Sequence, residues 1–181
     1  MRITPTPIAG CVHIEPEVFQ DARGELFEPW NAQRWGAAGL ATRFVQALQC
    51  RSTRGVLRGL HYQSPKPQAK LIWVIEGEIL DVAVDLRSGS PTFGQHVAAP
   101  LSGTRQLLIP EGCAHGYLVR SATAVVGYLI SAPHDPSCDH SLAWDDPALG
   151  IDWGIDAPLL SERDRRAPGL SAVVPVVLSR S

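Results

Sequence analysis

The chain has 181 residues, of which 45% are hydrophobic and 19% are charged, and its formal net charge is −2 at pH 7. This length suits one domain with a sizeable core, and the balanced charge argues against a nucleic-acid-binding protein, which is basic overall or carries a basic stripe. No apolar run approaches the roughly 20 residues of a membrane helix, residues 1–10 lack the pattern of a signal peptide, and the four cysteines form no CxxC pair, which predicts reduced thiols in the cytoplasm.

The first part of the chain predicts short strands and one short helix. Residues 12–19 have the composition of a strand region that is broken at Pro16, and a turn follows at 21–25. Asn31 is a suitable N-cap for a helix that runs towards Ala38, with Gly39 ending it.

The rest of the chain predicts many short strands separated by Gly/Pro turns. In residues 79–86 the apolar positions alternate, so that Leu80, Val82, Val84 and Leu86 share one face and Asp81, Ala83 and Asp85 share the other. Strands at about ten-residue spacing are typical of an antiparallel sandwich or barrel. We therefore expect a single, mainly β domain over 1–181, with 168–181 as a C-terminal tail; further strands are expected to begin at 44 and to cover 71–75, 106–109 and 125–130.

Residues 54–63 carry the most unusual chemistry, because two arginines, two glycines and a histidine alternate with apolar residues. Arginine suits phosphate or carboxylate, and histidine is the side chain that titrates near neutral pH. An edge strand with solvated charges is the alternative. The glycines permit a bulge. Without a bulge, one face of the strand would hold Val56, Arg58, Leu60 and Tyr62, and the other face would hold Leu57, Gly59, His61 and Gln63.

A second cluster follows the spacing P-x-G-x-x-H from Pro110 to His115. Gly112 and Gly116 bracket the histidine and suggest a turn that holds its ring against a strand. This spacing is similar to the second motif of the cupin superfamily. Metal-binding cupins typically have H-x-H and a glutamate in the first motif, whereas this chain has His61-Tyr62-Gln63. Because a catalytic metal usually needs three protein ligands, we expect no metal, and a metal-dependent oxygenase is a remote alternative.

The same stretches, taken together, resemble the dTDP-4-dehydrorhamnose 3,5-epimerase family. The similarity runs in order from about residue 10 to 170, and several blocks in sequence are far more specific than any one of them. It implies a cupin-type jelly roll (a double-stranded β-helix with a few short helices), no cofactor and a dTDP-4-keto-deoxysugar substrate. The blocks are residues 54–63, 68–71, 81–87, 90–94, 109–116, 144–147, 151–153 and 160–164.

The resemblance also implies a set of catalytic residues. Epimerisation beside a ketone needs a base, an acid on the opposite side and a cation for the enolate oxygen. By resemblance, His61 is the base, Asp164 its carboxylate partner, Tyr128 the acid and Lys70 the cation. A solvated lysine is the alternative at Lys70. The resemblance places His115 near the sugar, and a packed structural histidine is its alternative.

For the nucleotide, the resemblance assigns the diphosphate to Arg58 and Arg23, and the thymine and deoxyribose to Glu28 and Gln46. Arg23 would reach in from a second subunit, so the assignments of Arg23 and Glu28 presume a homodimer with exchanged N-terminal strands.

The chain departs from the family pattern around the substrate. The family commonly has Gln-Asp-Asn where this chain has Gln46-Ala47-Leu48, so a nucleotide contact is lost or replaced. An aromatic pair that often follows the catalytic tyrosine is also missing, and the chain has Pro133-His134 there. The main hypothesis is inversion at C3 and C5 of dTDP-4-keto-6-deoxyglucose; inversion of a single carbon is the nearest alternative, and a non-enzymatic sugar- or nucleotide-binding cupin is a further one.

Overall fold

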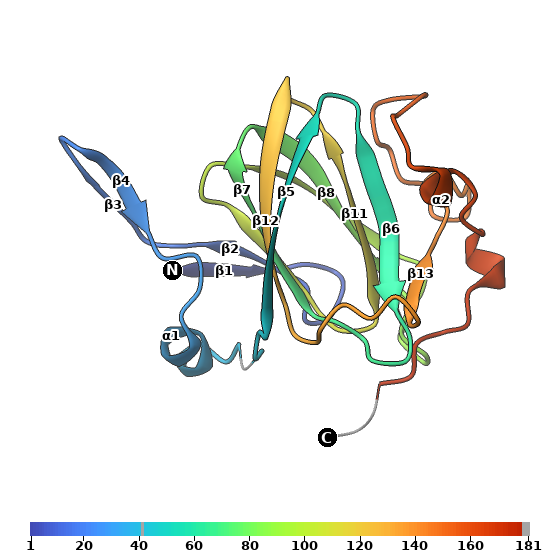
Figure 1. The fold of residues 1–181 in the computed structure, drawn as a ribbon. Helices are drawn as coiled ribbons and strands as arrows, with labels where there is room; N and C mark the ends of the chain where they lie inside the picture. The colour runs from blue at the N-terminus through green and yellow to red at the C-terminus, as the bar shows by residue number, and fades with distance from the viewer. Residues whose placement is uncertain (41, 179–181) are drawn as a thin grey trace.

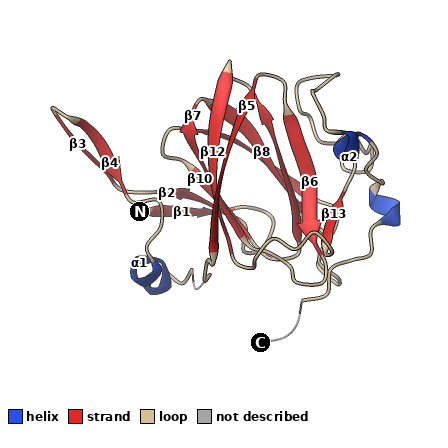
Figure 2. Cartoon of the chain, in the orientation of Figure 1, coloured by secondary structure: helices blue, strands red, loops and turns tan. Residues whose placement is uncertain are grey.

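Two antiparallel β-sheets pack face to face in the computed structural model, which describes residues 1–40 and 42–178. One sheet has the strand order β1-β2-β10-β7-β12-β5, and the other has the order β13-β6-β11-β8-β9. Figures 1 and 2 show these sheets as one rolled sandwich, from which the separate β3–β4 hairpin projects. This mainly β jelly roll with short helices confirms the predicted fold class.

The strands are short and closely spaced along the chain, as the turn pattern predicts. They are β1 (Arg2–Pro5), β2 (Val12–Glu15), β3 (Val18–Asp21), β4 (Gly24–Phe27), β5 (Gln46–Thr53), β6 (Leu57–Gln63), β7 (Lys70–Glu76), β8 (Glu78–Asp85), β9 (His96–Ser102), β10 (Gln106–Ile109), β11 (Cys113–Val119), β12 (Thr123–Ile130) and β13 (Asp139–Ser141); the helices are α1 (Ala32–Ala37), α2 (Glu162–Arg165) and the 3₁₀ turn η1 (Leu170–Ala172).

Strand β8 shows how the alternating sequence builds the core. Ile79 and Ala83 point into the cluster between the two sheets, whereas Leu80 and Val82 belong to a second cluster on the outer face of the five-stranded sheet. Both faces of β8 are therefore buried, and the predicted alternation is confirmed. The second cluster is covered by the chain after β13, which wraps over this sheet in Figure 1.

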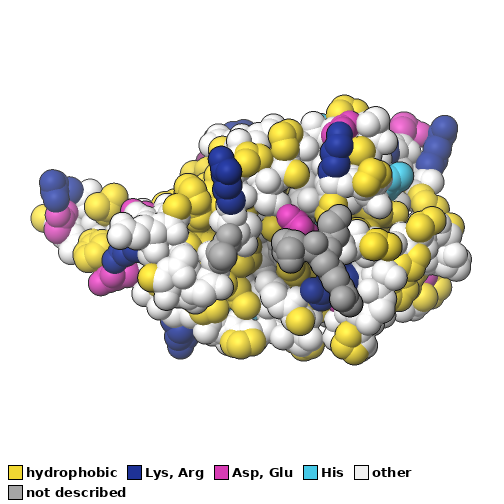
Figure 3. Space-filling model, turned by 90° about the horizontal axis from the view of Figure 1, so that it is seen from below, with side chains coloured by type: hydrophobic (Ala, Val, Ile, Leu, Met, Phe, Trp, Pro, Cys, Tyr) yellow, Lys and Arg dark blue, Asp and Glu magenta, His cyan; other side chains and the backbone are white. Residues whose placement is uncertain are grey.

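The N-terminal part forms an arm and a small helix beside the sandwich. Asn31 caps α1 by accepting hydrogen bonds from the backbone N–H groups of Gln33 and Arg34, as predicted. In the β3–β4 hairpin, Phe19 is 54% exposed and Leu26 is 70% exposed. Figure 3 shows this arm standing away from the body with hydrophobic side chains on its surface.

Two sequence-based expectations need correction or completion. The segment around His115 is not a turn, because it lies inside β11. Gly116 instead lets β6 approach closely: a Cβ atom on Gly116 would lie 2.7 Å from the Arg58 carbonyl oxygen. In the predicted tail, Val173 and Val176 are buried against the five-stranded sheet, while Val174 and Val177 are exposed. Residues 179–181 of that tail lie outside the described residues.

Within the described ranges, no helix has the length and apolar character needed to cross a membrane.

Candidate active site

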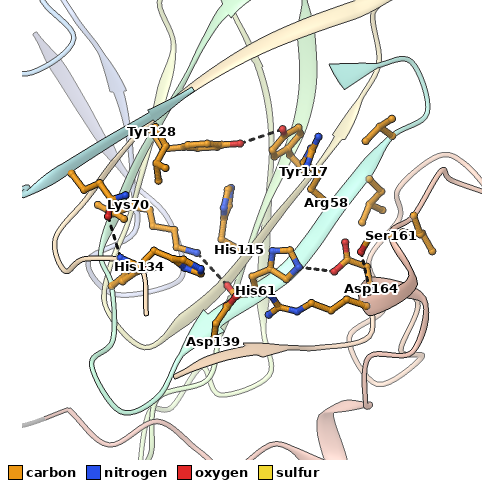
Figure 4. A pocket seen from close by; sticks show the side chains of 18 of the residues that line it. Arg58, His61, Lys70, His115, Tyr117, Tyr128, His134, Asp139, Ser161 and Asp164 are labelled. Carbon is orange, nitrogen blue, oxygen red and sulfur yellow. Dashed lines mark hydrogen bonds and ion pairs between the residues drawn. The ribbon is translucent and has the colours of Figure 1, made fainter. Parts of the chain in front are cut away.

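A cavity of about 760 Å³ opens between the two sheets, at the end where β5, β6 and β12 meet the chain before α2. It brings together residues far apart in the sequence, and Figure 4 shows their side chains pointing into it. Its polar lining comes from both sheets and from α2. The lining residues that carry the argument below are Gln46, Leu48, Arg58, His61, Lys70, His115, Tyr117, Tyr128, His134, Asp139, Ser161, Arg163 and Asp164.

A bulge in β6 places Arg58 and His61 on the same side. His61 pairs with His115 and Arg58 pairs with Tyr117, so two residues of β6 face a single residue, Gly116, of β11. Strict alternation would have put Arg58 and His61 on opposite faces. Gly59 makes the bulge possible, because its φ is +114° and a Cβ there would lie 2.6 Å from the His115 carbonyl oxygen.

His61 forms a close pair with a buried carboxylate. Its Nε2 atom lies 2.5 Å from Oδ1 of Asp164, whose side chain is only 4% exposed. Burial alone raises the pKa of Asp164, but hydrogen bonding, above all with His61, outweighs burial and leaves that pKa below its ordinary value. An ionised carboxylate only accepts hydrogen bonds, so Nε2 carries the hydrogen and Nδ1 is the basic atom of the neutral ring.

Asp164 is held in place by the short helix α2. Ser161 caps this helix by accepting a hydrogen bond from the Asp164 backbone N–H. The neighbouring Arg163 reaches back to β13, where its Nη1 lies 2.5 Å from Oδ2 of Asp139 and its Nε donates to the Ser141 hydroxyl at 2.7 Å. Because β13 pairs directly with β6 at His61, these contacts tie the carboxylate to the strand that carries the histidine.

Lys70 lies at the start of β7, in the opposite sheet. Its Nζ donates to the backbone carbonyl of His61 at 3.3 Å. Loss of solvent lowers the pKa of Lys70 to about 8, and the negative charge of Asp139 opposes that shift only in part. Lys70 is therefore a cation at neutral pH that lacks a direct carboxylate partner among the described residues, so its charge is available to an anionic oxygen in the cavity.

His115 forms a second histidine–carboxylate pair behind the first. Its Nε2 lies 2.7 Å from Oδ1 of Asp81, and both side chains are buried. Burial lowers the pKa of His115 even though Asp81 opposes the shift, so the ring is neutral at pH 7. The side chain lines the cavity, and the structure therefore gives His115 both a packed position and access to a ligand.

Tyr128 projects into the cavity from β12 and meets a second tyrosine. Its hydroxyl lies 3.2 Å from the Tyr117 hydroxyl of β11. Burial raises the pKa of Tyr128 well above its ordinary value, so the phenol is fully protonated at pH 7. In Figure 4 the Tyr128 ring lies across the cavity from His61.

Arg58, Gln46 and Leu48 form the end of the cavity near β5. Arg58 donates through Nε to the Ser52 hydroxyl at 3.0 Å, which leaves its terminal nitrogens free to meet a ligand. The Gln46 side-chain oxygen accepts from the backbone N–H of His134 at 3.1 Å. Leu48 lines the same wall, so the position where the family commonly has asparagine presents an apolar surface here.

Arg23 and Glu28 lie outside this cavity. Arg23 sits at the turn of the projecting hairpin, where its side chain is 90% exposed and pairs with Asp21. Glu28 follows the hairpin and accepts hydrogen bonds from Asn31 and Arg34. A single copy of the chain thus does not bring these two predicted residues into the site.

Across the described ranges, no group of three or more His, Cys, Asp or Glu side chains is arranged to hold a metal ion.

Several cavity residues were not singled out from the sequence. Tyr117 follows His115 by two positions in a strand, so simple alternation could have placed both on the same face. Ser161 and Arg163 lie in the block 160–164 that carries the family resemblance, but were given no role. Asp139 gave no comparable signal, because β13 is very short and its position depends on tertiary packing.

The family model described as dTDP-4-dehydrorhamnose 3,5-epimerase matches residues 5–172. The chain belongs to this family. A relative from Pseudomonas aeruginosa, named dTDP-4-dehydrorhamnose 3,5-epimerase, is 48% identical over 170 residues, covering 92% of this chain and 94% of the relative. A relative from Streptomyces niveus, named dTDP-4-dehydrorhamnose 3-epimerase, is 39% identical and covers 92% of this chain and 83% of its own.

A similar solved structure is that of a Legionella pneumophila 3,5-epimerase in complex with dTDP-4-keto-L-rhamnose. It shares 42% identity, has a TM-score of 0.94 and covers 99% of both chains. These comparisons confirm the family and the enzyme class predicted from the sequence blocks.

Proposed function

We propose that this protein inverts C3 and C5 of dTDP-4-keto-6-deoxy-D-glucose and so produces dTDP-4-keto-L-rhamnose. One observation carries the proposal: His61, with Asp164 behind it, and Tyr128 enter a single cavity from opposite sheets. Epimerisation removes a proton from one face of a carbon and returns a proton to the other face, so a base and an acid must face each other across the sugar.

The chemistry follows from the states of these groups. The basic nitrogen of His61 takes the proton from a carbon beside the C4 ketone, and the electron pair of that C–H bond forms the C=C bond of an enolate. The Tyr128 hydroxyl then gives its proton to the same carbon from the other side. Solvent returns a proton to Tyr128 and removes the one held by His61, so that the enzyme is regenerated.

Asp164 and Lys70 stabilise the charges that this reaction creates. The Asp164 carboxylate, 2.5 Å from His61 Nε2, stabilises the imidazolium and holds the ring in one tautomer. Lys70 supplies a positive charge to the C4 oxygen as it becomes an enolate, and because burial lowers the pKa of Lys70, this interaction is stronger there than in bulk water.

The nucleotide part would occupy the end of the cavity near β5. Arg58 is placed for the diphosphate, since its terminal nitrogens are free. Gln46 would contact the nucleoside from the neighbouring wall, and His115 would face the sugar from behind. The cytoplasmic location stays a prediction from the cysteine pattern.

We further propose that two copies of the chain form a homodimer with exchanged N-terminal strands. The β3–β4 hairpin exposes Phe19 and Leu26 and carries Arg23 away from its own cavity. Strand β5 is an edge strand beside the cavity, and an open edge readily accepts another strand. In such a dimer, Arg23 and Glu28 of one copy would complete the nucleotide site of the other.

Mixing two inactive variants tests this exchange. Light scattering should first show a dimer. Arg23→Ala and His61→Ala proteins, each weakly active alone, should regain activity when their subunits are mixed, because one of the two sites then has both residues. A failure to regain activity in proven mixed dimers would place Arg23 in the site of its own subunit and overturn the exchange.

Proton NMR in D₂O tests the reaction itself. With dTDP-4-keto-6-deoxyglucose, the protein should incorporate deuterium at C3 and C5 and yield the inverted sugar, and His61→Ala should abolish both. His96→Ala is a matched control, because His96 lies on β9 outside the cavity. If the unaltered protein exchanges hydrogen at neither C3 nor C5, the proposed substrate or reaction is refuted.

Inversion of a single carbon is the second candidate. It rests on Leu48 and His134, which line the cavity and stand where the family resemblance implies polar and aromatic side chains; a relative from Streptomyces niveus is named as a 3-epimerase. The same NMR experiment distinguishes the two, because a single-carbon enzyme would label only one position.

A further inference from the structure

Two tyrosines, one from each sheet, meet at the cavity: Tyr117 from β11, beside the strand of His61, and Tyr128 from β12 in the opposite sheet. The hydroxyls of Tyr117 and Tyr128 are 3.2 Å apart, and their ring centroids are separated by 6.4 Å. Figure 4 shows the two side chains meeting tip to tip at the upper end of the cavity. Tyr117 is only 2% exposed, so packing leaves its ring little room to move, although the side chain lines the cavity.

The position of Tyr117 is fixed by the same strand pairing that builds the catalytic wall. On β11, Tyr117 faces Arg58 of β6, while His115 two residues earlier faces His61. The other edge of β11 pairs with β8 along seven residues. The Tyr117 ring therefore has little freedom to leave the Tyr128 hydroxyl, and its geometry is set before any ligand enters.

Tyr128 needs a partner of this kind to act as an acid. Burial raises the pKa of Tyr128 far above that of a phenol in water, so the anion that remains after proton donation is costly in this environment. A hydroxyl donor beside the developing phenolate oxygen lowers that cost, and hydrogen bonds to a charged group are about twice as strong as neutral ones. Burial also raises the pKa of Tyr117, to about 12, so Tyr117 carries its proton at neutral pH and has a hydrogen to donate.

We propose that Tyr117 is a positioning residue for the proton-donation step, which orients the Tyr128 hydroxyl and donates a hydrogen bond to the phenolate that forms there. The inference rests on the proposed function. In this step the Tyr128 O–H bond breaks, the proton joins the enolate carbon, and the electron pair stays on the Tyr128 oxygen. Tyr117 turns its hydroxyl hydrogen towards that oxygen, and solvent later restores the lost proton to the tyrosine pair, so no further reactant is needed.

The test compares inversion with isotope exchange in Tyr117→Phe. His61 can return a deuteron to the face from which it took the proton, so recovered substrate gains deuterium without the help of Tyr128. We expect inversion by Tyr117→Phe to slow by roughly 10- to 100-fold, while exchange into recovered substrate continues. The ratio of exchange to inversion should therefore rise by about tenfold or more, which a general loosening of the site would not produce.

Two further variants make the result decisive. Tyr62→Phe removes the hydroxyl of another buried tyrosine that does not line this cavity, and it should leave the ratio unchanged. In a Tyr128→Phe background, Tyr117→Phe should cause no additional loss of inversion, because it acts through Tyr128. Melting temperatures of all variants should confirm that they are folded.

The outcomes separate this inference from the proposed function. If the unaltered protein inverts its substrate but Tyr117→Phe slows inversion and exchange in proportion, the inference is wrong and the proposed function stands. An undiminished effect of Tyr117→Phe in the Tyr128→Phe background would overturn it as well. If the unaltered protein catalyses neither exchange nor inversion, it is the proposed function that fails.

Discussion

The pH dependence of activity should report the state of Lys70. Burial lowers the pKa of Lys70 to about 8, so the group is charged at pH 7 and loses its charge as the pH rises through about 8. At pH 9 only about one tenth of the enzyme would carry the cation, whereas a lysine with an ordinary pKa near 10.4 would still be about 96% charged. If the cation stabilises the enolate oxygen, kcat/KM should fall about tenfold per pH unit above pH 8.

The measurement is kcat/KM between pH 6 and 10, because this ratio reports the free enzyme. The two cavity tyrosines do not interfere, since burial raises the pKa of Tyr117 to about 12 and that of Tyr128 further. Lys70→Arg should remove the alkaline limb whatever its absolute activity, because a guanidinium stays charged throughout this range.

Cys50 requires its own control, because its thiol could titrate in the same range. Burial raises the pKa of Cys50, but hydrogen bonds with neighbouring hydroxyls outweigh burial and bring it below its ordinary value. Cys50→Ser should leave the alkaline limb where it is. A flat kcat/KM up to pH 10 in the unaltered protein would refute the role of Lys70, and a limb that persists in Lys70→Arg would assign it to another group.

Two substitutions test the geometry around His61. Asp164→Asn keeps the shape of the side chain but removes the charge 2.5 Å from His61; kcat/KM should fall on the order of 10- to 100-fold, and an unchanged value would show that the pair has no part in catalysis. Gly59→Ala should destabilise the fold by roughly 3 kcal/mol in urea unfolding, through a clash 2.6 Å from the His115 carbonyl oxygen together with an unfavourable φ of +114°. Gly24→Ala is its control, because Gly24 has a similar φ of +124° but no atom within 4 Å of the added Cβ; equal losses in the two variants would show that the clash costs nothing.

Local patterns in the sequence were sufficient for most of the framework. The alternation in residues 79–86 correctly predicted both faces of β8, and Asn31 correctly predicted the start of α1. The pattern misled at Gly116, which resembles a turn residue. There the glycine permits close approach of two strands inside a sheet, a tertiary role that local sequence does not distinguish from a turn.

The site depended more heavily on long-range structure. His61 and Asp164 are 103 residues apart, and no periodicity links them, so their pairing was predicted only from the resemblance to the family. The common face of Arg58 and His61 was likewise open, because it requires the bulge at Gly59 and Leu60. A bulge is specified by how β11 packs against β6, and single-strand alternation carries no information about it.

Leu48 and His134, two positions where the sequence departs from the pattern that the family resemblance implies, both line the cavity. Leu48 lies on β5, and the backbone N–H of His134 donates to the side-chain oxygen of Gln46 on the same strand at 3.1 Å. The groups proposed to move protons, His61 and Tyr128, lie on other strands and keep their own partners. Since one base and one acid serve carbons on both sides of C4, the sugar must shift between two positions for double inversion. Under the proposed mechanism, we therefore expect substitutions in the wall of Gln46, Leu48 and His134 to change whether one carbon or both are inverted, and substitutions of His61 or Tyr128 to change the rate of each inversion.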